Sequence, residues 1–190
     1  MEVTESYRHA DYKFDLYYAM VGMDENYAEV EKKIGRTRTD VFTDIGDRLV
    51  AIEIQHTRIP IKSILRRMKY HTEIGAHTLW IITPETINYH KGIRNLNWIM
   101  FIQRLQNGIV FLPGKTDQTV IPARIDNMLR LTGDEITAGR KWLDCQPETE
   151  ITKLTFEKNV EFGLNVSSYP DWFTDNYLEF VSNNFTSSIY

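Results

Sequence analysis

The sequence predicts an α/β fold in which helices flank a central mixed β-sheet. Apolar residues recur at helical spacing near the start of the chain, three strand-like segments follow, and a second helix then leads into a continuously apolar strand. This order of elements is typical of a sheet with helices on its faces. The chain has 190 residues, 42% hydrophobic and 25% charged, which fits a soluble globular domain with a terminal extension.

The first third of the chain gives the clearest signals. Residues 4–21 carry apolar side chains at helical spacing, and Gly22 is expected to end this helix. The second and third strand-like segments are joined by a tight turn around Ile45-Gly46-Asp47. Three strands are therefore predicted, at 27–34, 39–44 and 48–56.

The middle of the chain alternates helix and strand. Pro60 opens a second helix that runs to about Glu73, and Gly75 closes it. The segment HTLWIIT, residues 77–83, is predicted to be a buried strand because it is almost continuously apolar. A third helix at 93–107 and a short strand in the segment IVFLPG are predicted next.

The last third gives weaker signals. Helices are expected at 134–144 and 171–184, and a strand at 150–157. We therefore divide the chain into a core, residues 1–125, and a C-terminal extension, residues 126–190. The last helix has an apolar stripe, which predicts that the extension packs on the core or contacts a partner, such as a second copy in a homodimer. This stripe consists of Phe173, Tyr177, Phe180 and Val181.

The composition excludes several classes of protein. Cys145 is the only cysteine, so neither an intrachain disulfide nor a cysteine-rich zinc cluster can form. The longest apolar runs, WIMFI and LWII, are too short to span a bilayer, and the N-terminal segment MEVTESYRHADYK has no apolar stretch typical of a secretory signal. We therefore expect a soluble cytoplasmic protein with no membrane partner.

Positive charge is concentrated in the middle of an acidic chain. The net charge is −4, yet residues 54–116 contain nine Lys or Arg and two acidic residues. Such a block is typical of a local surface for a polyanion. A solvated helix face, balanced by acidic residues from elsewhere in the fold, explains the same block equally well.

An acidic residue interrupts one of the predicted strands. In the segment VAIEIQ, Glu53 and Gln55 are two residues apart and share one face of the strand. With a hairpin turn at Ile45-Gly46, Asp40 lies opposite Ala51 on that same face, about 7–8 Å from Glu53 across a diagonal. Two carboxylates so placed can share a divalent cation such as Mg²⁺, which also keeps water and phosphate as ligands.

A purely structural interpretation of Glu53 stays open beside this one. The carboxylate could pair with an arginine that is near in sequence. A one-residue slip of the hairpin would also move Asp40 to the opposite face of the sheet. The arginines concerned are Arg36, Arg38 and Arg58.

A larger constellation surrounds the two acids. It comprises Glu5, His9, Lys13, Asp40, Glu53-Ile54-Gln55, Arg66, Tyr70 and Trp80-Ile81. Its order is a helix with three polar residues at four-residue spacing, an acid on a hairpin strand, an E-x-Q strand, a helix with Arg and Tyr, and a strand ending in Trp-Ile. From about Glu5 to Thr83 the sequence thereby resembles the nuclease domain of CoiA-like competence proteins, members of the PD-(D/E)xK nuclease superfamily. The resemblance implies a restriction-endonuclease-like fold.

The resemblance also implies a metal-dependent nuclease. It assigns Asp40 and Glu53 as ligands of Mg²⁺ or Mn²⁺, and it puts Gln55 in the place of the superfamily's usual lysine. Because glutamine cannot ionise, Gln55 is expected to orient a water or bind phosphate through hydrogen bonds. Thr39 stands where the superfamily name has proline. This position shapes the backbone, and we expect the replacement to have little effect. The expected activity is hydrolysis of phosphodiester bonds in DNA with low sequence specificity, and RNA is an alternative substrate.

The first helix is expected to contribute to the same site. Glu5, His9 and Lys13 share one helix face. The resemblance makes Glu5 an outer metal ligand, places His9 near the water or phosphate, and turns Lys13 toward the nucleic acid. A solvated face with an i,i+4 ladder is the alternative.

The second helix is expected to bind nucleic acid. Arg66 and Tyr70 are i,i+4 neighbours that could hold a phosphate or brace the hairpin, and Lys62 and Lys69 suit contacts with the backbone. A basic solvated face is the alternative.

A second function remains open for the whole chain. The same scaffold could be a catalytically inactive nuclease fold that binds nucleic acid or a protein partner, as an accessory protein or inhibitor. The small size of the chain and its acidic balance are compatible with it.

Overall fold

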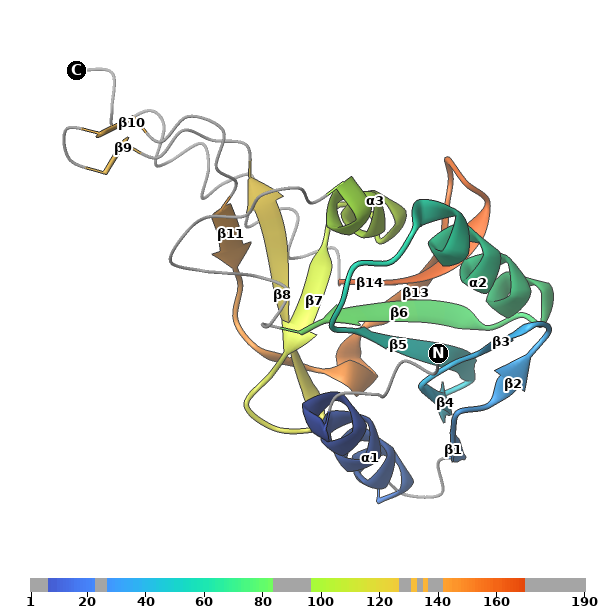
Figure 1. The fold of residues 1–190 in the computed structure, drawn as a ribbon. Helices are drawn as coiled ribbons and strands as arrows, with labels where there is room; N and C mark the ends of the chain where they lie inside the picture. The colour runs from blue at the N-terminus through green and yellow to red at the C-terminus, as the bar shows by residue number, and fades with distance from the viewer. Residues whose placement is uncertain are drawn as a thin grey trace.

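A mixed β-sheet forms the centre of the computed structural model, and helices cover both of its faces (Figure 1). The structure describes residues 7–22, 27–83, 97–126, 131–132, 135–136 and 142–169. The helices are α1 (Tyr7–Val21), α2 (Ile61–Glu73) and α3 (Asn97–Leu105), with a short 3-10 helix at Ile151–Lys153. This arrangement confirms the predicted α/β fold.

The strands in the described part of the chain form one ten-stranded sheet and two short ribbons. The strands of the main sheet are β1 (Ala28–Val30), β4 (Val41–Ile45), β5 (Arg48–Gln55), β6 (His77–Ile82), β7 (Val110–Pro113), β8 (Thr119–Asp126), β11 (Trp142–Cys145), β12 (Thr149–Glu150), β13 (Thr155–Asn159) and β14 (Leu164–Ser168). The ribbons pair β2 (Lys33–Ile34) with β3 (Thr37–Arg38), and β9 (Leu131–Thr132) with β10 (Glu135–Ile136).

The main sheet follows the order β1-β4-β5-β6-β7-β8-β11. Strands β5, β6 and β7 run parallel, because α2 connects the first two and α3 lies between the second and the third. Strand β14 pairs in parallel with the beginning of β6, with Val166 opposite Thr78. Strands from both sides of residue 125 thus share one sheet, and the division into core and extension stays a prediction.

Side chains of the sheet alternate between two apolar cores. On β6, Trp80 and Ile82 pack on the side of α2 and α3, whereas Leu79 and Ile81 pack on the side of α1. All residues of β6 are buried. Because helices cover both faces, this strand is the almost continuous apolar run that the sequence showed. None of the described helices is long and apolar enough to cross a membrane.

The β4–β5 hairpin turns one residue later than predicted. Gly46 has a φ of +62°, and Ile45 pairs with Arg48 across the turn. The register is therefore shifted by two residues from the predicted one, in which Asp40 faced Ala51. Because the shift is an even number, every side chain keeps its predicted face. Continuing the observed register from the pair of Val41 and Ile52 by one residue places Asp40 directly opposite Glu53, not on a diagonal.

Three element predictions differ from the structure. The strand at 27–34 is broken into β1 and β2, because Glu31 has a φ of +51° and turns the chain. The helix at 134–144 is wrong, since the described residues of this segment belong to β10 and β11. Pairing with β8 supplies backbone partners to β11 and overrides a weak helical pattern. The predicted strand at 150–157 is interrupted by the 3-10 helix at Ile151–Lys153, which separates β12 from β13. The helix at 171–184 lies outside the described residues, and β8 and β14 were not predicted.

Candidate active site

The predicted acids meet on the face of the sheet that α2 covers. Glu53 lies in the middle of β5 and is fully buried, beside Trp80 of the neighbouring strand β6. Asp40 precedes β4 and is half-buried. Gln55 ends β5 on the same face, two residues after Glu53. The structure therefore brings Asp40, Glu53 and Gln55 together as the strand pattern predicted.

Hydrogen bonds hold Asp40 against β5. Its Oδ2 accepts a hydrogen bond from the backbone N–H of Ile54 at 2.8 Å. The preceding residue, Thr39, is buried, and its hydroxyl donates to the backbone carbonyl of Ile52 at 3.1 Å. Proline, which the superfamily name has at this position, could not make that second contact, because it carries no hydroxyl. Thr39 and Asp40 together attach the start of β4 to Ile52 and Ile54 of β5.

Arg67 of α2, which the sequence did not single out, binds Glu53. Oε2 of Glu53 accepts a hydrogen bond from Nη1 of Arg67 and forms an ion pair with it. Nε2 of His71 lies 3.4 Å from the other oxygen, Oε1, and neither of these two buried atoms has a hydrogen-bond partner. Nδ1 of His71 is hydrogen-bonded to Oγ1 of Thr78 at 3.0 Å. Arg67 thus engages one oxygen of Glu53, while the other contacts His71 without a hydrogen bond.

Burial sets the protonation of these two groups. Burial raises the pKa of Glu53 to about 8, with Arg67 acting in the opposite direction and Asp40 adding to the rise. Burial, followed by the charge of Arg67, lowers the pKa of His71 to about 4. His71 is therefore neutral at pH 7, and its contact with Glu53 is not an ion pair there. A buried acid whose pKa is raised this far is typical of a functional site.

These shifts predict an unusual dependence of stability on pH. Glu53 keeps a proton in the folded state between its ordinary pKa of 4.5 and about 8, so its contribution to stability falls as pH rises through that window. His71 takes up its proton more readily when unfolded, between about 4 and its ordinary 6.5, so its contribution rises with pH over that range. The two windows overlap between pH 4.5 and 6.5, where the opposite slopes offset each other. We therefore expect a broad plateau of stability there and a decline of about 2 kcal/mol from pH 6.5 to 8.

Urea unfolding in EDTA across this pH range checks the expectation. The Glu53→Gln variant should show little decline from pH 6.5 to 8, because it has no proton to lose. A variant curve that falls as steeply as the wild-type curve would contradict the assignment.

The two acids have the chemistry of a site for the divalent cation that the sequence resemblance predicts. Oε1 of Glu53 is a buried oxygen without a hydrogen-bond partner, and the charge of Asp40 acts on it, which is the situation that a bound cation relieves. The described residues contain no group of three or more His, Cys, Asp or Glu side chains arranged around a metal. Two carboxylates nevertheless suit Mg²⁺, which keeps several waters and takes phosphate oxygens. Asp40 and Glu53 fit such an ion.

Gln55 is oriented at the end of β5. Its amide Nε2 donates a hydrogen bond to the backbone carbonyl of Thr57 at 2.6 Å. The amide oxygen is left as the group that could accept a hydrogen bond from a water or a sugar hydroxyl.

The side chains predicted to bind nucleic acid on α2 are divided between surface and interior. Lys62, Arg66 and Lys69 are exposed, and Nζ of Lys69 lies 3.9 Å from Oε1 of Glu73. Tyr70 is half-buried and packs against Gly35 of the neighbouring ribbon. Tyr70 also packs against Phe42 and Ala51 of the β4–β5 hairpin, and its predicted contact with phosphate stays a prediction.

Sequence analysis missed Arg67 and His71, although a signal was present. Ile64 and Met68 are the buried apolar residues of α2. Positions 67 and 71 lie three residues after each of them and share their side of the helix. If α2 is oriented with this apolar stripe toward the sheet, Arg67 and not Arg66 faces Glu53.

Of the three site residues predicted on the first helix, the structure describes the side chain of Lys13 alone. Lys13 is 1% exposed, and its Nζ forms an ion pair with Oε1 of Glu31 at 2.8 Å. Its ammonium is thus engaged within the protein in this conformation and is not offered to a phosphate at the surface. Glu5 and the side chain of His9 lie outside the described residues, so their roles stay predictions.

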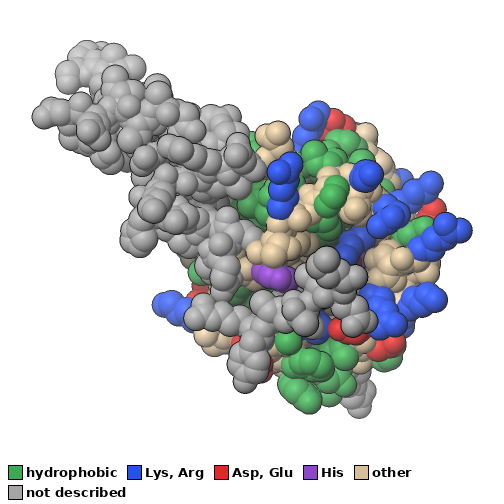
Figure 2. All heavy atoms as spheres, in the orientation of Figure 1, with side chains coloured by type: hydrophobic (Ala, Val, Ile, Leu, Met, Phe, Trp, Pro, Cys, Tyr) green, Lys and Arg blue, Asp and Glu red, His purple; other side chains and the backbone are tan. Residues whose placement is uncertain are grey.

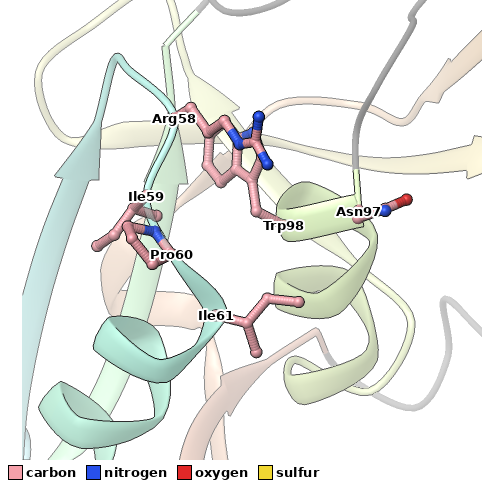
Figure 3. Close-up of a pocket in the computed structure, with 6 residues that line it drawn as sticks. All are labelled: Arg58, Ile59, Pro60, Ile61, Asn97 and Trp98. Carbon is pink, nitrogen blue, oxygen red and sulfur yellow. The ribbon is translucent and has the colours of Figure 1, made fainter.

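A pocket lies beyond the end of β5, between the loop that precedes α2 and the first turn of α3 (Figure 3). Its volume is about 470 Å³, and it is lined by Arg58, Ile59, Pro60, Ile61, Asn97 and Trp98. These lining residues include a cation but no carboxylate. The pocket therefore does not coincide with the pair of Asp40 and Glu53.

Comparison with known families supports the resemblance seen in the sequence. The model of the family described as "Competence protein CoiA, nuclease-like domain" matches residues 5–144, which is most of the chain. No curated protein and no solved structure matches the chain. The match, together with the mixed sheet and its helices, confirms the restriction-endonuclease-like fold class. The chain belongs to the CoiA nuclease-like domain family.

Proposed function

We propose that this protein is a metal-dependent nuclease of the PD-(D/E)xK type that hydrolyses phosphodiester bonds in DNA with low sequence specificity. The family match supports a nuclease in general. The single observation that carries the finer proposal is the buried carboxyl group of Glu53, whose Oε1 has no hydrogen-bond partner and belongs to the same site as Asp40. A buried oxygen without a hydrogen bond is costly, and a bound ligand at that oxygen would offset the cost.

Asp40 and Glu53 would hold the cation, Mg²⁺ or Mn²⁺. Such an ion, when bound, supplies Lewis acidity and lowers the pKa of a bound water. Arg67 holds Oε2 of Glu53, so that only Oε1 is presented. The backbone N–H of Ile54 restricts Asp40 in the same way.

Gln55 would orient the attacking water through its amide. It replaces the lysine of the superfamily and cannot carry charge or take a proton, so its contribution is limited to positioning. The exposed cations of α2 would contact the sugar-phosphate backbone. Such contacts carry no sequence information, which is why low specificity is proposed.

A catalytically inactive scaffold is the second candidate function. The observation that favours it is the ion pair between Glu53 and Arg67, which places a positive charge where the proposed cation also acts. In this alternative the ion pair is structural, and the protein binds nucleic acid or a protein partner without cleaving it.

A cleavage assay separates the two functions. Labelled single-stranded, duplex and branched DNA, and RNA of the same sequence, are incubated with the protein in Mg²⁺, in Mn²⁺ and in EDTA. The nuclease is expected to cut DNA at many positions in either metal and to leave it intact in EDTA. Intact substrates under every condition would favour the binding scaffold, and cleavage of RNA alone would correct the substrate.

A further inference from the structure

The β2–β3 ribbon, residues 33–38, is a basic element outside the predicted site. Its outward side chains include Lys33 and Arg38, which lie directly opposite each other, while Ile34 and Thr37 are buried beneath. Like charges at directly opposed positions destabilise a strand pair. Arg36, at the turn, adds a third exposed cation, and residues 33–38 contain no acid.

The ribbon is fixed to α2 by a close backbone contact. Gly35 has a φ of +58°, and a Cβ at this position would lie 2.7 Å from Cδ1 of Tyr70. Ile34 is buried in a cluster with Phe42 and Ala51, against which Tyr70 also packs. The ribbon and α2 therefore present their cations from one rigid surface.

Most of these cations have no acidic partner in the part of the chain that the structure describes. Among the residues that the structure describes, no carboxylate forms an ion pair with Lys33, Arg36, Lys62 or Arg66, whereas Arg38 lies 3.4 Å from Glu31. Figure 2 shows Lys and Arg side chains gathered over α2 and the β2–β3 ribbon. Positive charge gathered in this way, in a chain of net charge −4, indicates a surface for a polyanion.

This basic surface borders the candidate active site on two sides. The ribbon ends at Arg38, two residues before Asp40. Helix α2 covers Glu53 through Arg67. A phosphate chain that contacts both elements would therefore pass the two acids.

We propose that the β2–β3 ribbon is a backbone-binding arm, which with α2 holds the sugar-phosphate backbone of a nucleic acid beside Asp40 and Glu53. The inference deepens the proposed nuclease function and rests on it for the position of the scissile phosphate. Binding through Lys33 and Arg36 is independent of cleavage, because it requires only charge.

Fluorescence anisotropy in EDTA tests the arm without cleavage. Labelled single-stranded and duplex DNA of equal length are titrated with wild type, with Lys33→Ala/Arg36→Ala, and with Arg48→Ala/Lys158→Ala, across a series of KCl concentrations. Arg48 and Lys158 are exposed cations outside the arm and α2. The slope of log K for binding against log[KCl] is negative. The arm variant should make it less steep by roughly 1.8 on duplex or roughly 1.4 on single strands, and the control variant should leave it unchanged.

A second pair of variants tests the docking of the arm with no change in charge. Gly35→Ala should displace the ribbon from Tyr70 and weaken DNA binding. Gly46→Ala has the same backbone strain at φ +62° but meets nothing within 4 Å, so it should bind as wild type does. Thermal unfolding of both variants confirms that they are folded.

Each outcome of these titrations decides the inference. Equal salt slopes for wild type and the arm variant would overturn it, as would the absence of wild-type binding to either DNA. Wild-type binding that the arm variant weakens, combined with no cleavage in Mg²⁺, would sustain the arm and reject the nuclease function.

Discussion

Glu53→Gln is expected to lower DNA cleavage by about 10²–10³-fold while leaving the chain folded. The amide has nearly the shape of the carboxylate and its oxygen can still face Arg67, so the packing around α2 is kept. It removes the negative charge that a divalent cation requires. It also removes a buried ionisable group whose pKa is about 8, so the fold is not expected to weaken at neutral pH.

Initial cleavage rates at pH 7.5 in Mg²⁺ measure the effect, with circular dichroism to confirm the fold. Glu161→Gln is the matched control, because Glu161 also pairs with an arginine, Arg104, but at an exposed position. The control should cleave at the wild-type rate. A Glu53→Gln protein that retains wild-type cleavage would show that this carboxylate is structural only.

Arg67→Ala is expected to weaken both the fold and the use of metal. Loss of the guanidinium leaves Glu53 buried without its ion-pair partner, which costs about 1–3 kcal/mol. It also removes the charge that opposes the rise in the pKa of Glu53. The carboxyl is then more often protonated at pH 7, so the Mg²⁺ concentration for half-maximal cleavage should rise about tenfold. The loss should shrink as pH increases.

Arg66→Ala is the control for this prediction, since the two arginines are consecutive. Arg66 is exposed and has no ion pair among the described residues. Its loss should raise the DNA concentration for half-maximal cleavage and leave the Mg²⁺ requirement and the stability unchanged. If Arg66→Ala changes the Mg²⁺ requirement and Arg67→Ala does not, then Arg66 supports metal binding and the role assigned to Arg67 is wrong.

The face of the sheet on which the acids lie was predictable from the sequence. A strand has a period of two, so Asp40, Glu53 and Gln55 kept their shared face although the hairpin register moved by two residues. The partner on α2 was harder to predict. A helix turns by about 100° per residue, so an error of one position exchanged exposed Arg66 for Arg67.

The late strands were not predictable from local sequence. The segment 134–144 has a helical pattern, yet its described residues belong to strands, and all four residues of β11 pair with β8. Strand β14 finds its place beside β6, from which it is about 90 residues distant in the chain. Such pairings depend on which strand edges of the sheet are open to a partner, and a short window of sequence does not contain that information.

The most direct test of the central claim is the binding of Mn²⁺ measured by calorimetry in the absence of nucleic acid. The account predicts one site in the wild-type protein that is lost in both Asp40→Asn and Glu53→Gln, with Glu161→Gln binding as wild type does. Binding that survives in both site variants, or its absence from the wild-type protein at millimolar Mn²⁺, would contradict a cation held between Asp40 and Glu53.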